Sequence, residues 1–306
     1  MSVEKAEIPV VDFGKFLKGD EADRKACAGE LVAAFKKYGF AYVVNHGVSK
    51  ELCESLRKET VKFFQLPLEE KMKLAWTSPE SNRGYSPIGQ EKLDLSRPEN
   101  DSKESFNIGK EGDALFPNQW PSEAQLPAFK HTFLAYWQAM FQLHLEILRA
   151  FALELNLGQD FFDQRCSDQD NTFRILHYPA TAKEGCVRAG AHSDYGSITL
   201  LMQDDVGGLE VLAPDGETWI PATPIEDAYV VNCGDLMKRW TNDTFNSNVH
   251  RVVCYPGAHL KERYSFAYFC NPNKDTMIEC LPNCGEPKYP PIKAFDHLVK
   301  QLSSTY

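Results

Sequence analysis

The sequence lacks several features that would assign it to particular classes of protein. It has no apolar run of about 18 residues or more, and its first residues, MSVEKAEIPV, lack the apolar core of a secretory signal peptide. It also lacks an excess of cationic residues, since 33 Lys and Arg stand against 43 Asp and Glu, whereas nucleic-acid binding needs clustered cations. We therefore expect a cytoplasmic protein that binds neither membrane nor nucleic acid.

The nine cysteines do not have the arrangement of a disulfide framework, because they are scattered and odd in number. Cys280 and Cys284 are close enough in sequence to raise the question of a zinc site, but no second pair of Cys or His residues stands nearby. We therefore expect free thiols in a reducing compartment. The chain has neither internal repeats nor low-complexity segments.

Helical patterns and loops occupy the first half of the chain. A helix is predicted from Asp20, as its N-cap, to about Tyr38. Residues 77–121 are rich in proline and glycine and are expected to form a hairpin and a mobile cover. A long helix is predicted from about Leu126 to Leu157, with apolar residues at helical spacing. His144 lies on its apolar face, which favours a core histidine over a functional one.

From Asn171 onward, short strands alternate with turn signals such as VGG and PDG. Strands are predicted at Phe173–Tyr178, Gly190–His192, Ser197–Gln203, Leu209–Leu212, Trp219–Pro221, Ala228–Asn232, Val249–Val253 and Tyr264–Phe269. Eight short strands in succession predict a two-sheet jelly roll.

The expected fold class is mainly β with flanking helices: a double-stranded β-helix (jelly-roll, cupin-like) core with a helical N-terminal region. A chain with 43% hydrophobic residues can bury one large core, so we expect a single domain over residues 1–306. Its parts would be N-terminal helices, strands and a loop cover (1–121), scaffold helices (122–170) and the jelly-roll core (171–306).

Two histidines and an aspartate have the composition of a metal site. Alternate side chains of an extended strand share a face, so His192 and Asp194 point the same way. His250 lies in a later valine-rich strand, NVHRVV, which the fold must bring back beside them. Two imidazoles and one carboxylate hold one face of a ferrous iron and leave its other positions open. By itself, however, a His-x-Asp tripeptide often arises by chance.

A cationic fork and a hydroxyl follow in a further strand, RYSFAYFC. Arg263 and Ser265 are two residues apart, and a guanidinium matches a carboxylate at two points. Together with the histidines and the aspartate they indicate an iron site with an anion-binding partner. Strand alternation also places Arg188 on the face of His192, provided that the strand is regular. Alternatively, Arg188 lies in a surface turn and pairs with Glu184.

A resemblance to a known family covers nearly the whole chain. It is carried by IPVVDF (Ile8–Phe13), GFAYVVNHGV (Gly39–Val48), RGYSP (Arg83–Pro87), KESFNIG (Lys103–Gly109), ILHYPA, AHSDYGSITLLMQDDVGGLEVL, VVNCGDLMKRWTND, NSNVHRVV and RYSF. In their order and spacing the chain resembles the iron(II)- and 2-oxoglutarate-dependent dioxygenases of the isopenicillin N synthase-like branch. That branch includes plant hormone and flavonoid oxygenases and fungal thymine hydroxylase.

The resemblance implies how the co-substrate is held. In the family, the tyrosine matching Tyr178 helps the Arg-x-Ser pair, here Arg263 and Ser265, to hold the distal carboxylate of 2-oxoglutarate. The family's usual asparagine two residues before this tyrosine is Leu176 here. This departure weakens the expectation of an extended polar network and leaves the roles of Arg263 and Ser265 intact.

The implied activity is that of a non-haem dioxygenase that uses Fe(II), 2-oxoglutarate and O2, with ascorbate as a stimulant. It oxidises, and by default hydroxylates, a C–H bond of a small organic molecule and forms succinate and CO2. His192, Asp194 and His250 would hold the iron. We expect a role in specialised (secondary) metabolism and no obligate protein partner.

The substrate pocket is less well defined by the sequence. Phe106, Asn107 and Phe269 occupy places that border the main substrate in related enzymes, although aromatic core packing explains the two phenylalanines equally well. Arg188 could reach an acidic or carbonyl-bearing substrate, and Arg83 is a further candidate from the loop cover.

Other functions are compatible with the same motifs. An iron oxidase of the isopenicillin N synthase type uses the same metal ligands without 2-oxoglutarate and can carry an Arg-x-Ser pair. A nucleobase hydroxylase is an alternative within the 2-oxoglutarate-dependent class. A non-catalytic binding protein on the same barrel is disfavoured by the intact set of metal ligands.

Overall fold

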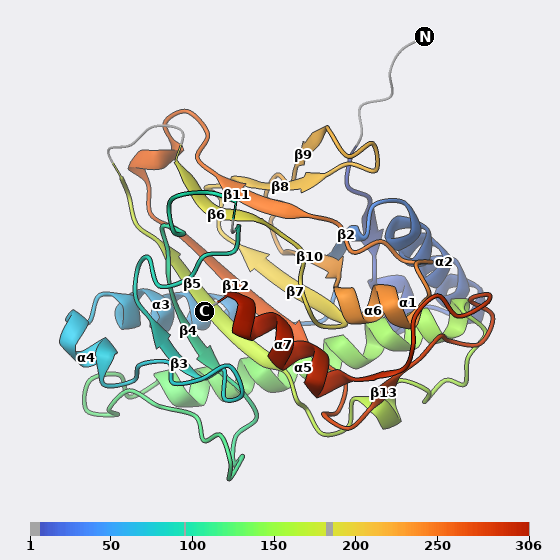
Figure 1. Ribbon diagram of the computed structural model, residues 1–306, viewed down its shortest axis with the longest axis horizontal. Helices are drawn as coiled ribbons and strands as arrows, with labels where there is room; N and C mark the ends of the chain where they lie inside the picture. Colours follow the sequence, from blue (N-terminus) through green and yellow to red (C-terminus); the bar gives the residue numbers. More distant parts are fainter. Residues whose placement is uncertain (1–6, 95, 182–185, 306) are drawn as a thin grey trace.

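Two β-sheets form the centre of the computed structural model, which describes residues 7–94, 96–181 and 186–305 (Figure 1). The larger sheet has the order β1 (Val10–Asp12), β2 (Phe40–Val44), β10 (Ala228–Cys233), β7 (Ile198–Gln203), β12 (Arg263–Cys270), β5 (Thr172–Tyr178), β4 (Glu104–Ile108) and β3 (Gly84–Ser86). The smaller has the order β6 (Val187–His192), β11 (His250–Val253), β8 (Leu209–Leu212) and β9 (Trp219–Pro221). A short pair, β13 (Met277–Ile278) and β14 (Ile292–Lys293), stands apart.

The eight strands predicted after Asn171 are all present, as β5 to β12, and the jelly-roll prediction is confirmed. The inner faces of the two sheets pack against each other through small and branched apolar side chains, among them Ala267 of β12 and Val211 of β8. Residues 77–121 contribute the predicted hairpin, in which β3 pairs with β4 at the edge of the larger sheet. The N-terminal strands β1 and β2 extend the opposite edge.

Helices α2 (Glu21–Lys37), α3 (Lys50–Phe64) and α5 (Phe129–Glu154) pack together, with α5 on the outer face of the larger sheet, whereas α7 (Ala294–Thr305) lies on its other side (Figure 1). The remaining helices are α1 (Gly14–Lys18), α4 (Leu68–Met72) and α6 (Asp235–Trp240), with single 3-10 turns at Asp163–Arg165 and Ala258–Leu260. Asp20 caps α2 as predicted, because its side chain accepts the Asp23 amide at 2.9 Å. The long helix α5 packs on β5, where the rings of Tyr136 and Phe173 lie 5.0 Å apart.

His144 is fully buried in α5, and burial lowers its pKa to about 3, so it is a neutral core histidine as predicted. No helix in the described ranges is long and apolar enough to cross a membrane.

The expectation that all cysteines are free thiols is wrong for one pair. Cys186 and Cys254 form a disulfide with a Cα–Cα distance of 5.5 Å. They stand at neighbouring ends of β6 and β11, where the amide of Cys254 donates to the carbonyl of Cys186. Only the pairing of these strands brings the two thiols together, since 68 residues separate them in sequence. The other seven cysteines, Cys280 and Cys284 included, are unpaired.

Strand β6 is irregular. His192 pairs with His250, but the next pair is Ala189 with Val252, so one strand advances by three residues and the other by two. The regular alternation that would place Arg188 on the face of His192 therefore does not hold along this strand.

Candidate metal and co-substrate site

A cavity between the two sheets collects most of the predicted site residues. Its volume is about 180 Å³. Since one water needs roughly 10–15 Å³, this space holds on the order of a dozen waters, enough for 2-oxoglutarate and part of a second small molecule. The predicted residues that line it are His192, Asp194, His250, Tyr178, Arg263, Ser265, Phe269 and Arg83.

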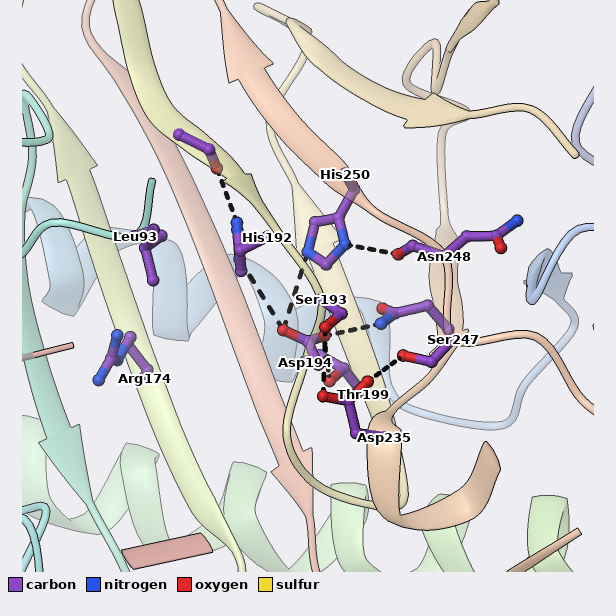
Figure 2. Close-up of polar contacts among 12 residues, drawn as sticks. Leu93, Arg174, His192, Ser193, Asp194, Thr199, Asp235, Ser247, Asn248 and His250 are labelled. Carbon is purple, nitrogen blue, oxygen red and sulfur yellow. Dashed lines mark hydrogen bonds and ion pairs between the residues drawn. The ribbon is translucent and has the colours of Figure 1, made fainter. Parts of the chain in front are cut away.

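Three of these residues form a compact set that could hold a metal ion. One ligand atom from each of His192, Asp194 and His250 lies within 4.8 Å of the other two. The Nε2 atoms of His192 and His250 are 4.0 and 3.7 Å from the Oδ1 atom of Asp194 (Figure 2). His192 ends β6 and is directly paired with His250 in β11, so the β-ladder itself brings the two imidazoles together. Two nitrogens and one carboxylate oxygen fit iron(II).

The backbone orients both imidazoles toward the carboxylate. Nδ1 of His192 lies 2.8 Å from the carbonyl oxygen of Gly190, and Nδ1 of His250 lies 3.4 Å from that of Asn248. With Nδ1 donating to a carbonyl, Nε2 carries the free lone pair that a metal requires. Burial, followed by the neighbouring His250, lowers the pKa of His192 to about 4, so that imidazole is neutral near pH 7.

Asp194 is held by two residues that the sequence analysis did not identify. Its Oδ2 atom accepts hydrogen bonds from the Thr199 hydroxyl at 2.6 Å and the Asn232 amide at 2.7 Å. Burial alone would raise the pKa of Asp194, but the two imidazoles and these hydrogen bonds hold it below its usual value. Oδ1 of this ionised carboxylate thus faces the two imidazoles and is free to bind a metal. Strand alternation from β7 could have suggested Thr199, whereas Asn232 reaches the site across the sheet.

Asp235 connects the two segments that carry His192, Asp194 and His250. Its carboxylate accepts the hydroxyl of Ser193 at 3.2 Å and that of Ser247 at 2.7 Å (Figure 2). Its amide also donates to the carbonyl of Asp194 at 2.8 Å. The first residue of α6 therefore fixes the turn after β6 and the segment before β11 at the same time.

Arg263 presents an incompletely satisfied guanidinium to the cavity. It is 1% exposed; Nε donates to the Gly207 carbonyl at 2.8 Å and Nη2 to Oε1 of Gln203 at 3.2 Å. Within the described residues, Nη1 has no acceptor and no carboxylate lies within 4 Å of the group. The guanidinium carbon lies 4.9 Å from the centre of the Tyr178 ring, and Ser265 lines the cavity beside it. This arrangement suits a bound carboxylate.

The remaining candidates for the substrate pocket divide between the cavity wall and its surroundings. Phe269 and Arg83 line the cavity. Phe106 does not, since it packs in the helix-covered core with its ring 4.7 Å from that of Phe63. Asn107 also stands behind the wall, where its Oδ1 atom accepts from Nε of Arg174 at 2.8 Å.

Arg188 does not line the cavity either. It is 1% exposed, so it does not occupy a surface turn, and its Nη2 donates to the carbonyls of Ala258 and Lys261. Burial and the neighbouring Arg263 lower the pKa of its guanidinium. The alternative partner, Glu184, lies outside the described residues.

A chain of buried charges supports one side of the cavity and was not foreseen. Arg174 pairs with Glu91 at 3.0 Å, and Lys103 pairs with Glu91 at 2.9 Å and Asp101 at 2.8 Å. Burial alone would lower the pKa of Lys103, but the two carboxylates raise it above its usual value. Arg174 is thereby held 5.7 Å from the centre of the Phe269 ring. Charged residues inside an otherwise apolar strand were the available signal.

The mouth of the cavity is covered by α7, drawn in dark red in front of the larger sheet (Figure 1). Four of its apolar side chains line the cavity: Phe295, Leu298, Val299 and Leu302. The loop before β3 contributes further wall residues, among them Arg83. These apolar side chains exclude water from the charged residues of the cavity and lower the local dielectric.

Known families and relatives match nearly the whole chain. Residues 8–123 match the N-terminal family of the non-haem dioxygenase in morphine synthesis, and residues 169–272 match the 2OG-Fe(II) oxygenase superfamily. The 2-oxoglutarate-Fe(II) type oxidoreductase hxnY of Emericella nidulans is 38% identical, over 97% of this chain and 90% of its own. The proline hydroxylase buaE of Petromyces alliaceus is 37% identical, over 90% of each chain.

One solved structure is similar to this chain in both sequence and fold over nearly its whole length. A Neurospora crassa protein solved in complex with alpha-KG (2-oxoglutarate) and thymine is 42% identical with a TM-score of 0.92, over 99% of this chain and 98% of that one. These likenesses set aside both the 2-oxoglutarate-independent oxidase and the non-catalytic binding protein. The chain belongs to the 2OG-Fe(II) oxygenase superfamily and is a non-haem iron(II)- and 2-oxoglutarate-dependent oxygenase that acts on a small organic molecule.

Proposed function

We propose that His192, Asp194 and His250 are the iron ligands of this oxygenase. The observation that carries the proposal is the convergence of two Nε2 atoms on Oδ1 of Asp194, at 4.0 and 3.7 Å, inside a cavity. Iron(II) bound there supplies the redox chemistry by which O2 oxidises both 2-oxoglutarate, to succinate and CO2, and a C–H bond of the second substrate. Asp194 offsets part of the metal charge, and His192 stays neutral and able to bind metal.

Arg263, Ser265 and Tyr178 bind the distal carboxylate of 2-oxoglutarate in this proposal. Arg263 supplies a buried cation with an unused Nη1, and the Ser265 and Tyr178 hydroxyls supply further donors to the same cavity. A carboxylate bound to this fork directs the 2-oxo acid end of the molecule toward the metal ligands. The protein's contribution is therefore to orient the co-substrate and to exclude water from it.

Hydroxylation of a small molecule in specialised metabolism is the reaction we propose, with ascorbate as a stimulant and the cytoplasm as its location. The relatives differ in what their names say they act on, since one is a proline hydroxylase and another was solved with thymine. Nucleobase hydroxylation is the second candidate, and the likeness to the thymine-bound structure favours it. We also infer that the chain acts as one domain, because β2 and β4 pair with strands of the jelly roll in a single sheet.

The test is substrate-stimulated succinate formation by the iron-loaded protein, together with an anaerobic iron(II) titration. We expect His192→Ala and Asp194→Ala to lose tight iron binding and succinate formation. His131→Ala, which removes an exposed histidine of α5, is the matched control and should behave as the wild type. Iron affinity near that of the wild type in Asp194→Ala would remove this residue from the ligand set.

A further inference from the structure

Arg83 is a buried cation with almost no partner among the residues that the structure describes. It is 8% exposed and lines the same cavity as the metal ligands. Nη1 donates to the carbonyl of Asn82 at 3.2 Å, and Nε, which is buried, has no acceptor among the described residues. Burial lowers the pKa of the guanidinium to about 10, so it remains charged near pH 7. Such a group is costly to bury unless something in the cavity pairs with it.

The two carboxylates that act electrostatically on Arg83 also interact with another cation. Asp113 and Asp170 act on Arg83 only from a distance, since neither lies within 4 Å of it. Each of them is 3.6 Å from Nζ of Lys274. Asp113 also accepts two backbone amides, and Asp170 accepts the amide of Lys274. Arg83 therefore forms no ion pair with any residue that the structure describes.

The position of the guanidinium is built into the surrounding backbone. The guanidinium of Arg83 lies directly on Gly109, and a Cβ atom added to Gly109 would collide with Nη2 of Arg83. The loop that carries Arg83 is fixed by Asn82, whose Oδ1 atom accepts the Asn107 amide at 2.9 Å. Gly84 follows with a φ of +99°, and a Cβ atom there would collide with the Leu74 carbonyl. The guanidinium is thus placed in advance of any ligand.

The surfaces that share this cavity with Arg83 are mainly apolar. Phe116 and the α7 residues Phe295 and Leu298 line it together with Arg83. Phe269 lines it as well, beside the Arg174 guanidinium. Asp170 and Lys274, whose charged groups are 3.6 Å apart, also line it. A ligand of this space would match the guanidinium of Arg83 at one point and mainly apolar walls elsewhere.

We propose that the main substrate of this oxygenase is a small carboxylic acid with an apolar body, whose carboxylate is bound by Arg83. A carboxylate pairs with the guanidinium in two-point fashion and neutralises it, whereas a neutral carbonyl would leave the buried charge in place. The apolar body then lies between Arg83 and the metal ligands, with a C–H bond facing His192, Asp194 and His250. The inference rests on the proposed function, because it assigns the second substrate of that same site.

Binding can be measured without turnover by loading the protein with Mn(II) and 2-oxoglutarate in the absence of O2. Calorimetry then measures the binding of three acids, 3-phenylpropanoate, cyclohexylacetate and octanoate. Each acid is compared with its own methyl ester and with thymine. We expect at least one acid to bind tenfold or more tightly than its ester and than thymine. Arg83→Gln should lose that preference, with tenfold or greater weakening, while its affinity for 2-oxoglutarate stays within twofold of the wild type.

Gly109→Ala supplies a second variant that keeps the charge and displaces it. Its new Cβ atom forces the guanidinium off its present position, so acid binding should again fall tenfold or more. Gly158→Ala is the matched control, since a Cβ there meets only Asp160 at 3.5 Å, and it should bind the acid as the wild type does. Thermal unfolding of each variant confirms that it is folded.

Several outcomes would overturn the inference while leaving the proposed function intact. They are equal binding of acid and ester by the wild type, thymine binding tighter than every acid, no binding of any acid, or acid binding unchanged in Arg83→Gln. Failure of the wild type to bind 2-oxoglutarate in the presence of Mn(II) would instead contradict the proposed function. The two failures are therefore distinguishable in one set of titrations.

Discussion

The side-chain amide of Asn232 donates to Oδ2 of Asp194 at 2.7 Å and so determines which carboxylate oxygen faces the two imidazoles. Asn232 comes from β10, in the larger sheet, whereas Asp194 follows β6, in the smaller one. The two sheets are therefore joined through a residue that we propose to be a metal ligand. Loss of a hydrogen-bond partner of this kind typically lowers metal affinity or activity by about 10–100-fold.

Asn232→Leu should weaken iron(II) binding by about 10–100-fold, because the carboxylate loses one of the two hydrogen bonds that orient it. An anaerobic metal titration measures the change. Asn100→Ala, which removes an exposed loop residue bonded to the Gly89 carbonyl, should leave the affinity unaltered. An affinity within twofold of the wild type in Asn232→Leu would mean that Thr199 alone orients Asp194.

Arg263→Ala should raise the 2-oxoglutarate dissociation constant by about 100-fold or more. Breaking a buried ion pair costs about 3 kcal/mol, which corresponds to that factor. Arg263→Lys keeps the charge and loses the planar fork, so its effect should be smaller but clear. Titration of 2-oxoglutarate into the Mn(II)-loaded protein measures both variants, with Arg24→Ala on α2 as control. Unchanged binding in Arg263→Ala would exclude the proposed role.

Asp235→Ala should destabilise the protein by about 1–3 kcal/mol, because two hydroxyls lose a charged acceptor. Two double-mutant cycles measure the hydrogen bonds separately, one pairing Asp235→Ala with Ser193→Ala and the other pairing it with Ser247→Ala. The quantity measured in each cycle is the free energy of unfolding of the single and double variants. We expect coupling in both cycles, the larger with Ser247, whose bond is the shorter. Strict additivity in both would show that Asp235 does not hold the two segments together.

Alkylation of the unfolded, unreduced protein should modify seven cysteines, and the count should rise to nine after reduction. Mass spectrometry of the alkylated peptides identifies Cys186 and Cys254 as the protected pair. Closing a loop of 68 residues restricts the unfolded chain, so reduction should lower the free energy of unfolding by about 4 kcal/mol. Modification of all nine before reduction would be incompatible with the disulfide.

Patterns that repeat along one strand or one helix could be predicted from the sequence. The eight strands after Asn171 and the α5 helix are found within a few residues of their predicted ends, because period-2 and period-3.6 patterns report which face is buried. The side chains of His192 and Asp194 converge as predicted, with Nε2 and Oδ1 4.0 Å apart, although β6 ends at His192 and Asp194 lies just beyond it. His250 could be placed beside them only with the help of the family resemblance.

Features that depend on how separate segments are paired could not be predicted. The irregular pairing of β6 with β11 invalidates the alternation argument for Arg188. Phe106 lies on the side of β4 that faces α5, and alternation alone does not say which side that is. The Cys186–Cys254 disulfide and the contact of Asn232 with Asp194 both arise from strands far apart in sequence.

The position of β2 in the larger sheet affects the order in which the molecule can be made. Its residue Tyr42 pairs with Val230 of β10, and no strand nearer in sequence covers that edge within the described part of the chain. At typical synthesis rates of about 5–20 residues per second, β2 leaves the ribosome on the order of ten seconds before its partner exists. β1 can pair with the other edge of β2, but the edge that will face β10 stays open during this time and is prone to mispairing. Because β2 and β10 are far apart in sequence, the folding of the complete chain should be slow.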